Sequence, residues 1–343
     1  MMDRRGFLSL LGLACGGCAG GIGSSGTAWS SGSLERADRI AKGHGAKGWG
    51  AWIGGRRVAG WSTNERGPSL SLTKVLAALA ATRAAGEGWL ADNESAASTL
   101  HEWRGDAAKM RITVLALLQQ TAGLEAGVAA LYRNPTDKGR NAVSLRVVDS
   151  PGSVFRYGPA CWEVLAELLN RKLVARGETL EKFLHRAVMR PIGLSSPDWR
   201  SDRKGRFFLS TGAEMSVEDL WRLGRTVGAL LRGESTQGFD AALFARMTRP
   251  SAVNPMFGGG IWRNVNARKG GAFPIEIEDA LDPPRGSGFW NSACISRRQP
   301  AEMVALVGSS GRRVFIWPAE NKVVARLGRA PSWKDGPFLD ALA

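Results

Sequence analysis

The sequence contains few of the residues that metal sites, disulfide scaffolds and histidine-dependent catalysis require. Its 343 residues include only 3 histidines, 4 cysteines and 2 tyrosines. No histidine or cysteine spacing matches a zinc site. A Ser-His-Asp triad is an alternative, but the G-x-S-x-G turn that often carries its serine is missing. We therefore expect neither a metal nor an organic cofactor. The three histidines are His44, His101 and His185.

Acidic residues are also scarce relative to basic ones. The chain has 46 Lys and Arg against 31 Asp and Glu, a formal net charge of +15. Such an excess is typical of proteins that bind nucleic acids or anionic surfaces. Here the basic residues occur singly or in pairs, and no basic tract or nucleic-acid motif accompanies them. We expect no nucleic-acid partner, whereas an anionic envelope surface remains possible.

No apolar run in the N-terminal region is long enough to cross a bilayer, which takes about 20 residues. Arg4 and Arg5 precede a short apolar stretch, residues 10–14, and Gly/Ser-rich sequence follows. This pattern is typical of a twin-arginine signal peptide. We predict a signal over residues 1–28, cleaved after Ala28, and hence an exported, periplasmic or secreted protein. Lipid attachment at Cys15 or Cys18 is a weaker alternative.

The other two cysteines, Cys161 and Cys294, lie in apolar surroundings. They could pair after export, but two buried free thiols are the favoured interpretation. The C-x-x-C of residues 15–18 and the G-x-G-x-x-G of residues 21–26 belong to the leader and lack the strand and helix that such motifs need. We assign no function to either.

One short segment carries the chemistry. Ser71-Leu72-Thr73-Lys74 precedes an Ala/Leu-rich run, residues 75–81, that predicts a buried helix ending near Gly86. A serine and a lysine three residues apart lie on one helical face, so the amine can reach the hydroxyl. A buried lysine loses its charge readily and becomes a base for a serine nucleophile. The competing interpretation of Ser71 is an ordinary helix N-cap.

The same spacing recurs at Ser201-Asp202-Arg203-Lys204. No apolar helix follows this second match, and its neighbours are charged residues and glycine. We interpret it as a solvated loop, because a motif needs its structural context.

Strand patterns lie at both ends of the chain and helical patterns in the middle. Residues 49–53 and 57–61 flank a Gly54-Gly55 turn and predict a hairpin. Further strands are expected at 258–262, 289–295, 303–307, 314–317 and 323–327. Helices are expected at 34–42, 165–174, 180–188 and from Ser216 to residue 231. The fold class is α+β, with an antiparallel sheet from about 45–65 and 258–330 and an all-helical region at about 90–250.

Several segments together resemble the serine β-lactamase and penicillin-binding-protein superfamily. The similarity is greatest to its branch of class C β-lactamases, esterases and 6-aminohexanoate-dimer hydrolases. Each segment is loosely similar, but their order matches. The segments are residues 71–74, 112–124, 151–157, 191–194, 215–220 and 311–318.

The resemblance implies a β-lactamase-like domain over residues 29–343 and an acyl-enzyme mechanism. Ser71 is then the nucleophile, Lys74 the base and Tyr157 the proton relay. The backbone of the segment Gly308, Ser309 and Ser310 binds the oxyanion or the substrate. The implied substrate is a small or peptide-like ester or amide.

Two positions depart from the family pattern. Pro159 stands where the tyrosine motif has asparagine, and Leu306 stands where the third motif has a lysine or histidine. A carboxylate-bearing substrate therefore lacks its usual cation. We expect an esterase or amidase; the alternatives are a D-Ala-D-Ala carboxypeptidase or β-lactamase of the same fold, and a catalytically impaired binding homologue.

Overall fold

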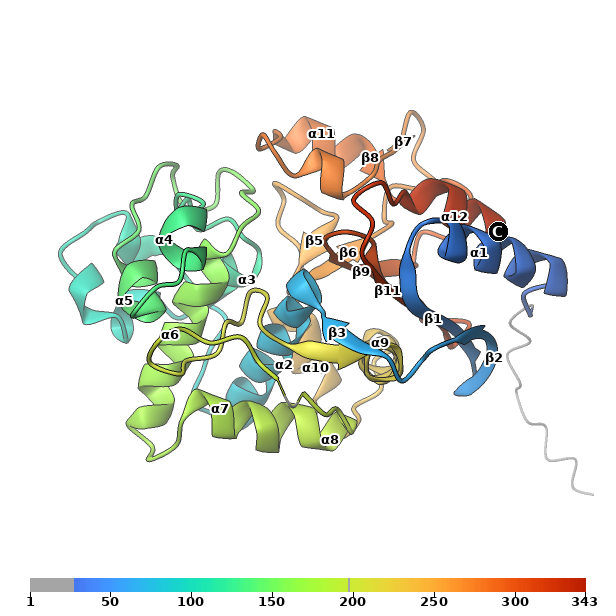
Figure 1. Ribbon diagram of the computed structural model, residues 1–343. Coiled ribbons are helices and arrows are strands. Elements are labelled where there is room, and N and C mark those ends of the chain that lie inside the picture. Colours follow the sequence, from blue (N-terminus) through green and yellow to red (C-terminus); the bar gives the residue numbers. More distant parts are fainter. Residues whose placement is uncertain (1–27, 197) are drawn as a thin grey trace, which may run out of the picture.

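The computed structural model describes residues 28–196 and 198–343, and it has a sheet region beside a helical region (Figure 1). The twin arginines, the apolar stretch of the leader, Cys15, Cys18 and both glycine or cysteine motifs of the leader lie outside the described residues. Among the described helices, none is long and apolar enough to cross a membrane.

A seven-stranded sheet is built from both ends of the chain, as the sequence predicts. Its strand order is β2-β1-β11-β10-β9-β6-β5, and every neighbouring pair is antiparallel. The Gly54-Gly55 turn joins β1 to β2. Both glycines have positive φ angles, 57° and 85°, which glycine adopts without the steric cost that a side chain would impose. The strands are β1 Ala46–Ile53, β2 Arg56–Trp61, β5 Phe257–Gly258, β6 Ile261–Arg263, β9 Val304–Gly308, β10 Arg312–Trp317 and β11 Lys322–Gly328.

Both faces of this sheet are covered. Helix α9 (Val217–Leu231) packs on one face, where a Cβ at its Gly224 would come within 2.7 Å of Val314. Helices α1 (Ser31–Gly43) and α12 (Asp335–Ala341) cover the other, and Phe338 of α12 contacts Phe315. Strands buried on both sides are apolar throughout rather than alternating. This explains the continuous apolar runs of β10 and β11.

The helical region forms a separate layer beside the sheet (Figure 1). Helix α2 (Thr73–Gly86) runs between the two regions, and most of its side chains are fully buried. The remaining helices are α3 Val114–Leu118, α4 Val128–Tyr132, α5 Lys138–Val143, α6 Ala160–Val174, α7 Leu180–Phe183, α8 Arg190–Ile192, α10 Ala241–Met247 and α11 Ser287–Ser292. A π-helical turn, Leu184–Met189, joins α7 to α8. The 3₁₀ turns are η1 Leu70–Leu72, η2 Ala96–Ser98, η3 His101–Trp103, η4 Lys109–Arg111 and η6 Glu278–Ala280.

Two short sheets complete the fold. Strands β3 (Arg66–Pro68) and β4 (Glu214–Ser216) pair antiparallel and connect the chain before Ser71 to the chain before α9. Strands β7 (Phe273–Pro274) and β8 (Ala293–Cys294) pair in parallel. Ser216 caps α9 in a reciprocal capping box with Asp219, which confirms the predicted helix start.

The strand predicted at 289–295 is wrong over most of its length. Residues 287–292 form α11, and only Ala293 and Cys294 are extended. The helix places Trp290 against Phe155 and Trp262, at 5.3 and 5.7 Å between ring centroids. Burial of this large ring in an aromatic cluster overrides the local strand pattern.

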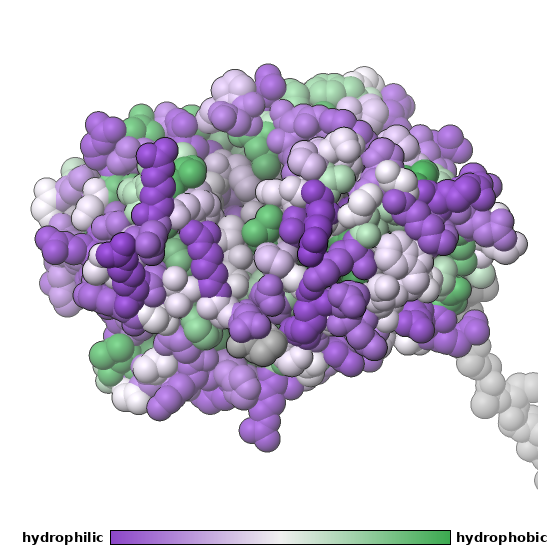
Figure 2. Space-filling model, viewed as in Figure 1, coloured by the Kyte–Doolittle hydropathy of each residue, from purple (hydrophilic) through white to green (hydrophobic). Residues whose placement is uncertain are grey.

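Cys161 and Cys294 are separate buried thiols, which confirms the favoured interpretation. Figure 2 shows hydrophilic residues spread across the face in view, with hydrophobic ones in small separate groups.

Candidate active site

Ser71 lies in a 3₁₀ turn rather than in the α-helix itself. Turn η1 immediately precedes α2, so Ser71 stands two residues before Thr73, where that helix begins. Leu70 has a φ of 49°, an uncommon value for a residue with a side chain. This conformation turns the chain sharply at the point where Ser71 is half-buried at a cavity.

Hydrogen bonds hold this turn to the loop before β4. Ser69 donates to the carbonyl of Ala213 from both its N–H and its hydroxyl, at 2.9 and 2.7 Å. The N–H of Ala213 donates in return to the Thr73 hydroxyl, at 3.2 Å. The residues on either side of Ser71 are thus fixed to one neighbouring segment.

Lys74 has the environment of a base. Its Nζ lies 2.7 Å from Ser71 Oγ and 2.9 Å from the carbonyl oxygen of Ser210, and the side chain is 2 % exposed. Burial lowers the pKa of Lys74 from 10.5 to about 7, although the negative charge of Glu163 opposes this shift. The neutral amine is therefore well populated near neutral pH. In that form it can take the proton of the Ser71 hydroxyl.

Tyr157 lies on the other side of Lys74, with its ring centroid 5.0 Å from Nζ. Gln120 positions it: the Arg156 N–H donates to the Gln120 carbonyl, and the Gly158 N–H donates to its side-chain oxygen. The ring packs against Phe257 and Trp262. Tyr157 is partly buried and lines the cavity, and burial raises its pKa although an interaction with Ser71 opposes this shift. The phenol stays protonated near neutral pH.

The end of β9 reaches the same site. A Cβ at Gly308 would lie 2.7 Å from the Ser69 carbonyl, so this glycine permits close approach of the strand to η1. Ser309 lines the cavity, and its N–H is a candidate oxyanion donor together with that of Ser71. Ser310 has its N–H directed at Glu278 Oε2, at 3.0 Å, so it is a weaker candidate. Leu306 is fully buried in the sheet.

These residues surround a cavity of about 550 Å³, within the range of small-molecule sites. Ser71, Lys74, Tyr157 and Ser309 all line it, and the structure thus brings these four predicted residues together. Gly308 and Ser310 are not among the residues that line it. The other lining residues include Leu70, Ala126, Val128, Tyr132, Arg156, Gly158, Pro159, Arg200, Thr211, Leu281, Asp282 and Pro284.

Several of these lining residues are not predicted from the sequence. Tyr132 ends α4, and its hydroxyl donates to Ser210 Oγ at 3.0 Å. Arg200 stacks over the rings of Tyr132 and Phe208, with its guanidinium carbon 5.4 and 4.7 Å from their centroids. In the described part of the chain, Arg200 has no carboxylate partner. No local motif marks these residues, because only folding brings their segments to the cavity.

The described residues that line the cavity include no histidine. Within residues 28–196 and 198–343, no three His, Cys, Asp or Glu side chains are grouped so that they could hold a metal. Ser201 of the second S-x-x-K match is exposed and does not belong to the lining of this cavity. The site therefore consists of a serine, a lysine and a tyrosine with backbone donors near them.

Comparison with known proteins finds one family model and several solved structures that are similar to this chain. The family model described as beta-lactamase matches residues 41–327. No match was found among curated proteins. A structure provisionally assigned as a β-lactamase from Bacteroides dorei has a TM-score of 0.67 and 15% identity, over 92% of this chain and 98% of that one.

Two further solved structures are similar. One is provisionally assigned as a 6-aminohexanoate-dimer hydrolase from Bacillus anthracis, with a TM-score of 0.63, 17% identity, and coverage of 89% of this chain and 78% of that one. The other is EstCE1, a hydrolase with promiscuous acyltransferase activity, with a TM-score of 0.62, 17% identity, and coverage of 90% and 98%. At these identities the likeness shows a shared fold.

Proposed function

The chain belongs to the β-lactamase family, whose members are serine hydrolases, and from this we propose that it is an exported hydrolase of esters or amides that acts through an acyl-enzyme on Ser71. The observation that carries the proposal is the 2.7 Å contact between Lys74 Nζ and Ser71 Oγ, made by a lysine that is almost completely buried. A structural lysine gains little from such a position, because burial disfavours its charge.

Acylation follows from this contact. The neutral amine of Lys74 takes the proton of Ser71 as Oγ forms a bond to the substrate's carbonyl carbon. Backbone N–H groups of Ser71 and Ser309 stabilise the resulting oxyanion. When the bond to the leaving group breaks, Tyr157 gives its proton to the departing oxygen or nitrogen and is reprotonated from Lys74. The products of this half-reaction are the acyl-enzyme and a free alcohol or amine.

Deacylation uses the same groups in reverse. A water molecule enters the leaving-group side, gives one proton to the Tyr157–Lys74 pair and forms a bond to the acyl carbon. The bond to Ser71 Oγ then breaks, and Oγ recovers a proton from Lys74. An acid is released and the enzyme returns to its starting state.

Neutral esters and amides suit this cavity best. A penicillin or a D-Ala-D-Ala peptide carries a carboxylate, and desolvating it without a partner costs several kcal/mol. Leu306 supplies no cation on the sheet side, and Pro159 offers no side-chain amide. Arg312 donates to the carbonyls of Pro68 and Ser309, and Arg313 pairs with Asp335.

One observation favours a second candidate, a carboxypeptidase or β-lactamase. Arg200 lies on the helical wall of the cavity and has no carboxylate partner among the described residues. An anionic substrate could approach this guanidinium. However, Arg200 is exposed, and a charge pair in contact with water contributes little.

The two candidate functions predict different ratios of ester hydrolysis to penicillin hydrolysis. We expect kcat/KM for a neutral short-chain aryl ester to exceed that for penicillin by roughly tenfold or more, equivalent to about 1.4 kcal/mol. Both substrates are measured with the wild type and with Arg200→Met. Penicillin turnover that equals ester turnover and depends on Arg200 would establish the second candidate. No turnover and no acylation by any probe would support the catalytically impaired homologue.

A further inference from the structure

Besides the Ser71 hydroxyl, a backbone carbonyl holds the amine of Lys74 in place. Its Nζ donates to the Ser210 carbonyl at 2.9 Å. A neutral amine that donates one N–H to this oxygen directs its lone pair elsewhere, and Ser71 Oγ is 2.7 Å away. Whatever fixes the Ser210 peptide therefore fixes the direction of the base.

A buried carboxylate fixes Ser210. Glu163 Oε1 accepts hydrogen bonds from the Ser210 N–H at 2.9 Å and from its hydroxyl at 2.5 Å. Its other oxygen, Oε2, pairs with Lys138 Nζ at 2.7 Å, and the two side chains are 0 % and 3 % exposed. Such a pair gains little net stability over apolar residues of the same volume. Its presence next to the base calls for another explanation.

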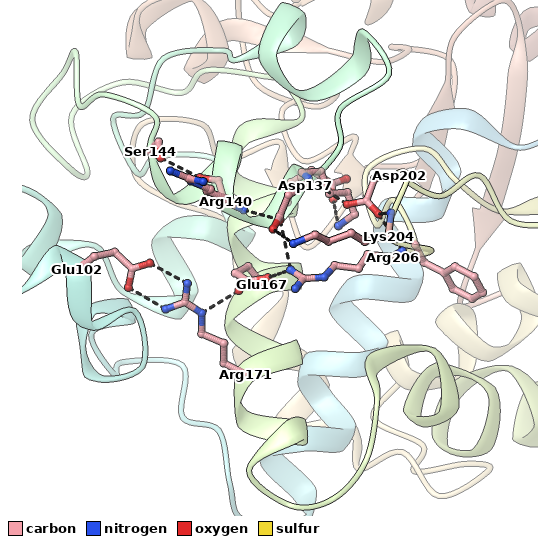
Figure 3. Close-up of polar contacts among 12 residues, drawn as sticks. Glu102, Asp137, Arg140, Ser144, Glu167, Arg171, Asp202, Lys204 and Arg206 are labelled. Carbon is pink, nitrogen blue, oxygen red and sulfur yellow. Dashed lines mark hydrogen bonds and ion pairs between the residues drawn. The ribbon is translucent and has the colours of Figure 1, made fainter.

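The loop that contains Ser210 is tied to the same helix by a further ion pair, between Arg206 and Glu167. Figure 3 shows Glu167, one turn after Glu163 on α6, between Arg171 and Arg206. The carboxylate of Asp202 accepts hydrogen bonds from the backbone N–H groups of Lys138, Lys204 and Arg206, at 2.9 to 3.0 Å. The chain from 202 to 210 is therefore anchored to α5 and α6 along its length.

We propose that Glu163 and Lys138 are positioning residues for the reaction, which by holding the Ser210 peptide direct the Lys74 amine at Ser71 and set its affinity for a proton. The inference rests on the proposed function of Ser71 and Lys74. The two side chains act on the proton affinity of Lys74 in opposite directions. The negative charge of Glu163 favours the charged form of Lys74, and the positive charge of Lys138 offsets that effect.

Two phenols lie close to the cluster and to Lys74. Tyr157 contacts Lys74, and Tyr132 donates to Ser210 Oγ. Burial raises the pKa of Tyr132 to about 12 and also raises that of Tyr157. Both phenols therefore remain neutral where Lys74 titrates.

The test is the pH dependence of acylation by a fluorophosphonate, measured on the full mature chain. Glu163→Gln removes a negative charge and is expected to move the midpoint to lower pH by roughly half a unit or more. Lys138→Met leaves Glu163 uncompensated and is expected to move it to higher pH. Glu102→Gln is the control. It makes the same charge change in the more exposed ion pair with Arg171, which Figure 3 also shows. We expect this variant to keep the wild-type midpoint of acylation.

A double variant separates positioning from folding. Glu163→Met with Lys138→Met removes both charges, so no unpaired ion is left in the interior. We expect it to fold, to keep KM for the ester within a few fold and to lose roughly tenfold or more in kcat. The proposal would be overturned if the double variant kept both the kcat and the acylation midpoint of the wild type. It would also be overturned if the acylation midpoint were the same in all variants. A wild type that is not acylated at Ser71 would instead refute the proposed function, and this inference with it.

Discussion

Replacing Lys74 by methionine is expected to change the pH dependence of stability as well as to stop the reaction. In the folded protein the pKa of Lys74 lies at about 7, against 10.5 for the unperturbed group. That difference corresponds to roughly 5 kcal/mol of unfavourable free energy when the buried amine is protonated. Methionine has a similar length and carries no charge, so Lys74→Met removes this cost.

The sign follows from proton binding. Between about pH 7 and pH 10.5 the unfolded chain holds a proton on Lys74 that the folded chain does not. The stability of the wild type relative to Lys74→Met therefore rises with pH across this window, and is lowest below it. From roughly pH 7.5 to pH 9 the difference in unfolding free energy should change by about 2 kcal/mol. The lost hydrogen bonds to Ser71 and Ser210 shift the difference by a constant amount.

Urea denaturation of both proteins at several pH values measures this quantity. Other titrating groups are common to the two proteins and cancel in the difference. The same lysine should control acylation, whose rate in the wild type is expected to rise with pH and level off above a midpoint near 7. A difference in stability that stays constant from pH 7.5 to 9 would show that Lys74 keeps an ordinary pKa, and would refute its role as a neutral base.

Three further predictions concern other parts of the account. Tyr157→Phe should lower kcat for a neutral ester by roughly a hundredfold with little change in melting temperature, because only the proton relay is lost; unchanged kcat would exclude the relay. Gly308→Ala places a Cβ 2.7 Å from the Ser69 carbonyl and should lower both acylation rate and melting temperature, whereas Gly288→Ala, with open space around its Cβ, should change neither; equal effects would contradict the close-approach argument. Arg4→Lys with Arg5→Lys should block export of a folded reporter fused after residue 30, and normal export of this variant would indicate the general secretory route.

The sequence was most informative where local pattern and tertiary packing agree. The hairpin of β1 and β2, the start of α9 at Ser216 and the strands β10 and β11 were each predicted by turn residues, caps or apolar runs. The S-x-x-K segment with its buried helix pointed to Ser71 and Lys74 for the same reason. The family relationship could be inferred because several weak similarities occur in one order.

The sequence was least informative where distant segments meet. Nothing near residue 210 indicates that its carbonyl contacts Lys74, because that contact depends on how a loop packs on α6. No local motif marks Tyr132, yet α4 places it at the cavity. Residues 289–295 have an apolar pattern that suits a strand, but the burial of Trp290 favours a helix. In each case the deciding interaction joins residues that are far apart in the chain.

The most direct test of the central claim is covalent labelling of the nucleophile. The wild type, Ser71→Ala and Ser201→Ala are treated with a fluorophosphonate and, separately, with a penicillin probe, and the modified peptide is identified by mass spectrometry. Our account predicts labelling at Ser71 in the wild type and in Ser201→Ala, and none in Ser71→Ala, which should remain folded. Labelling that persists in Ser71→Ala, or that maps to another residue in the wild type, would contradict it.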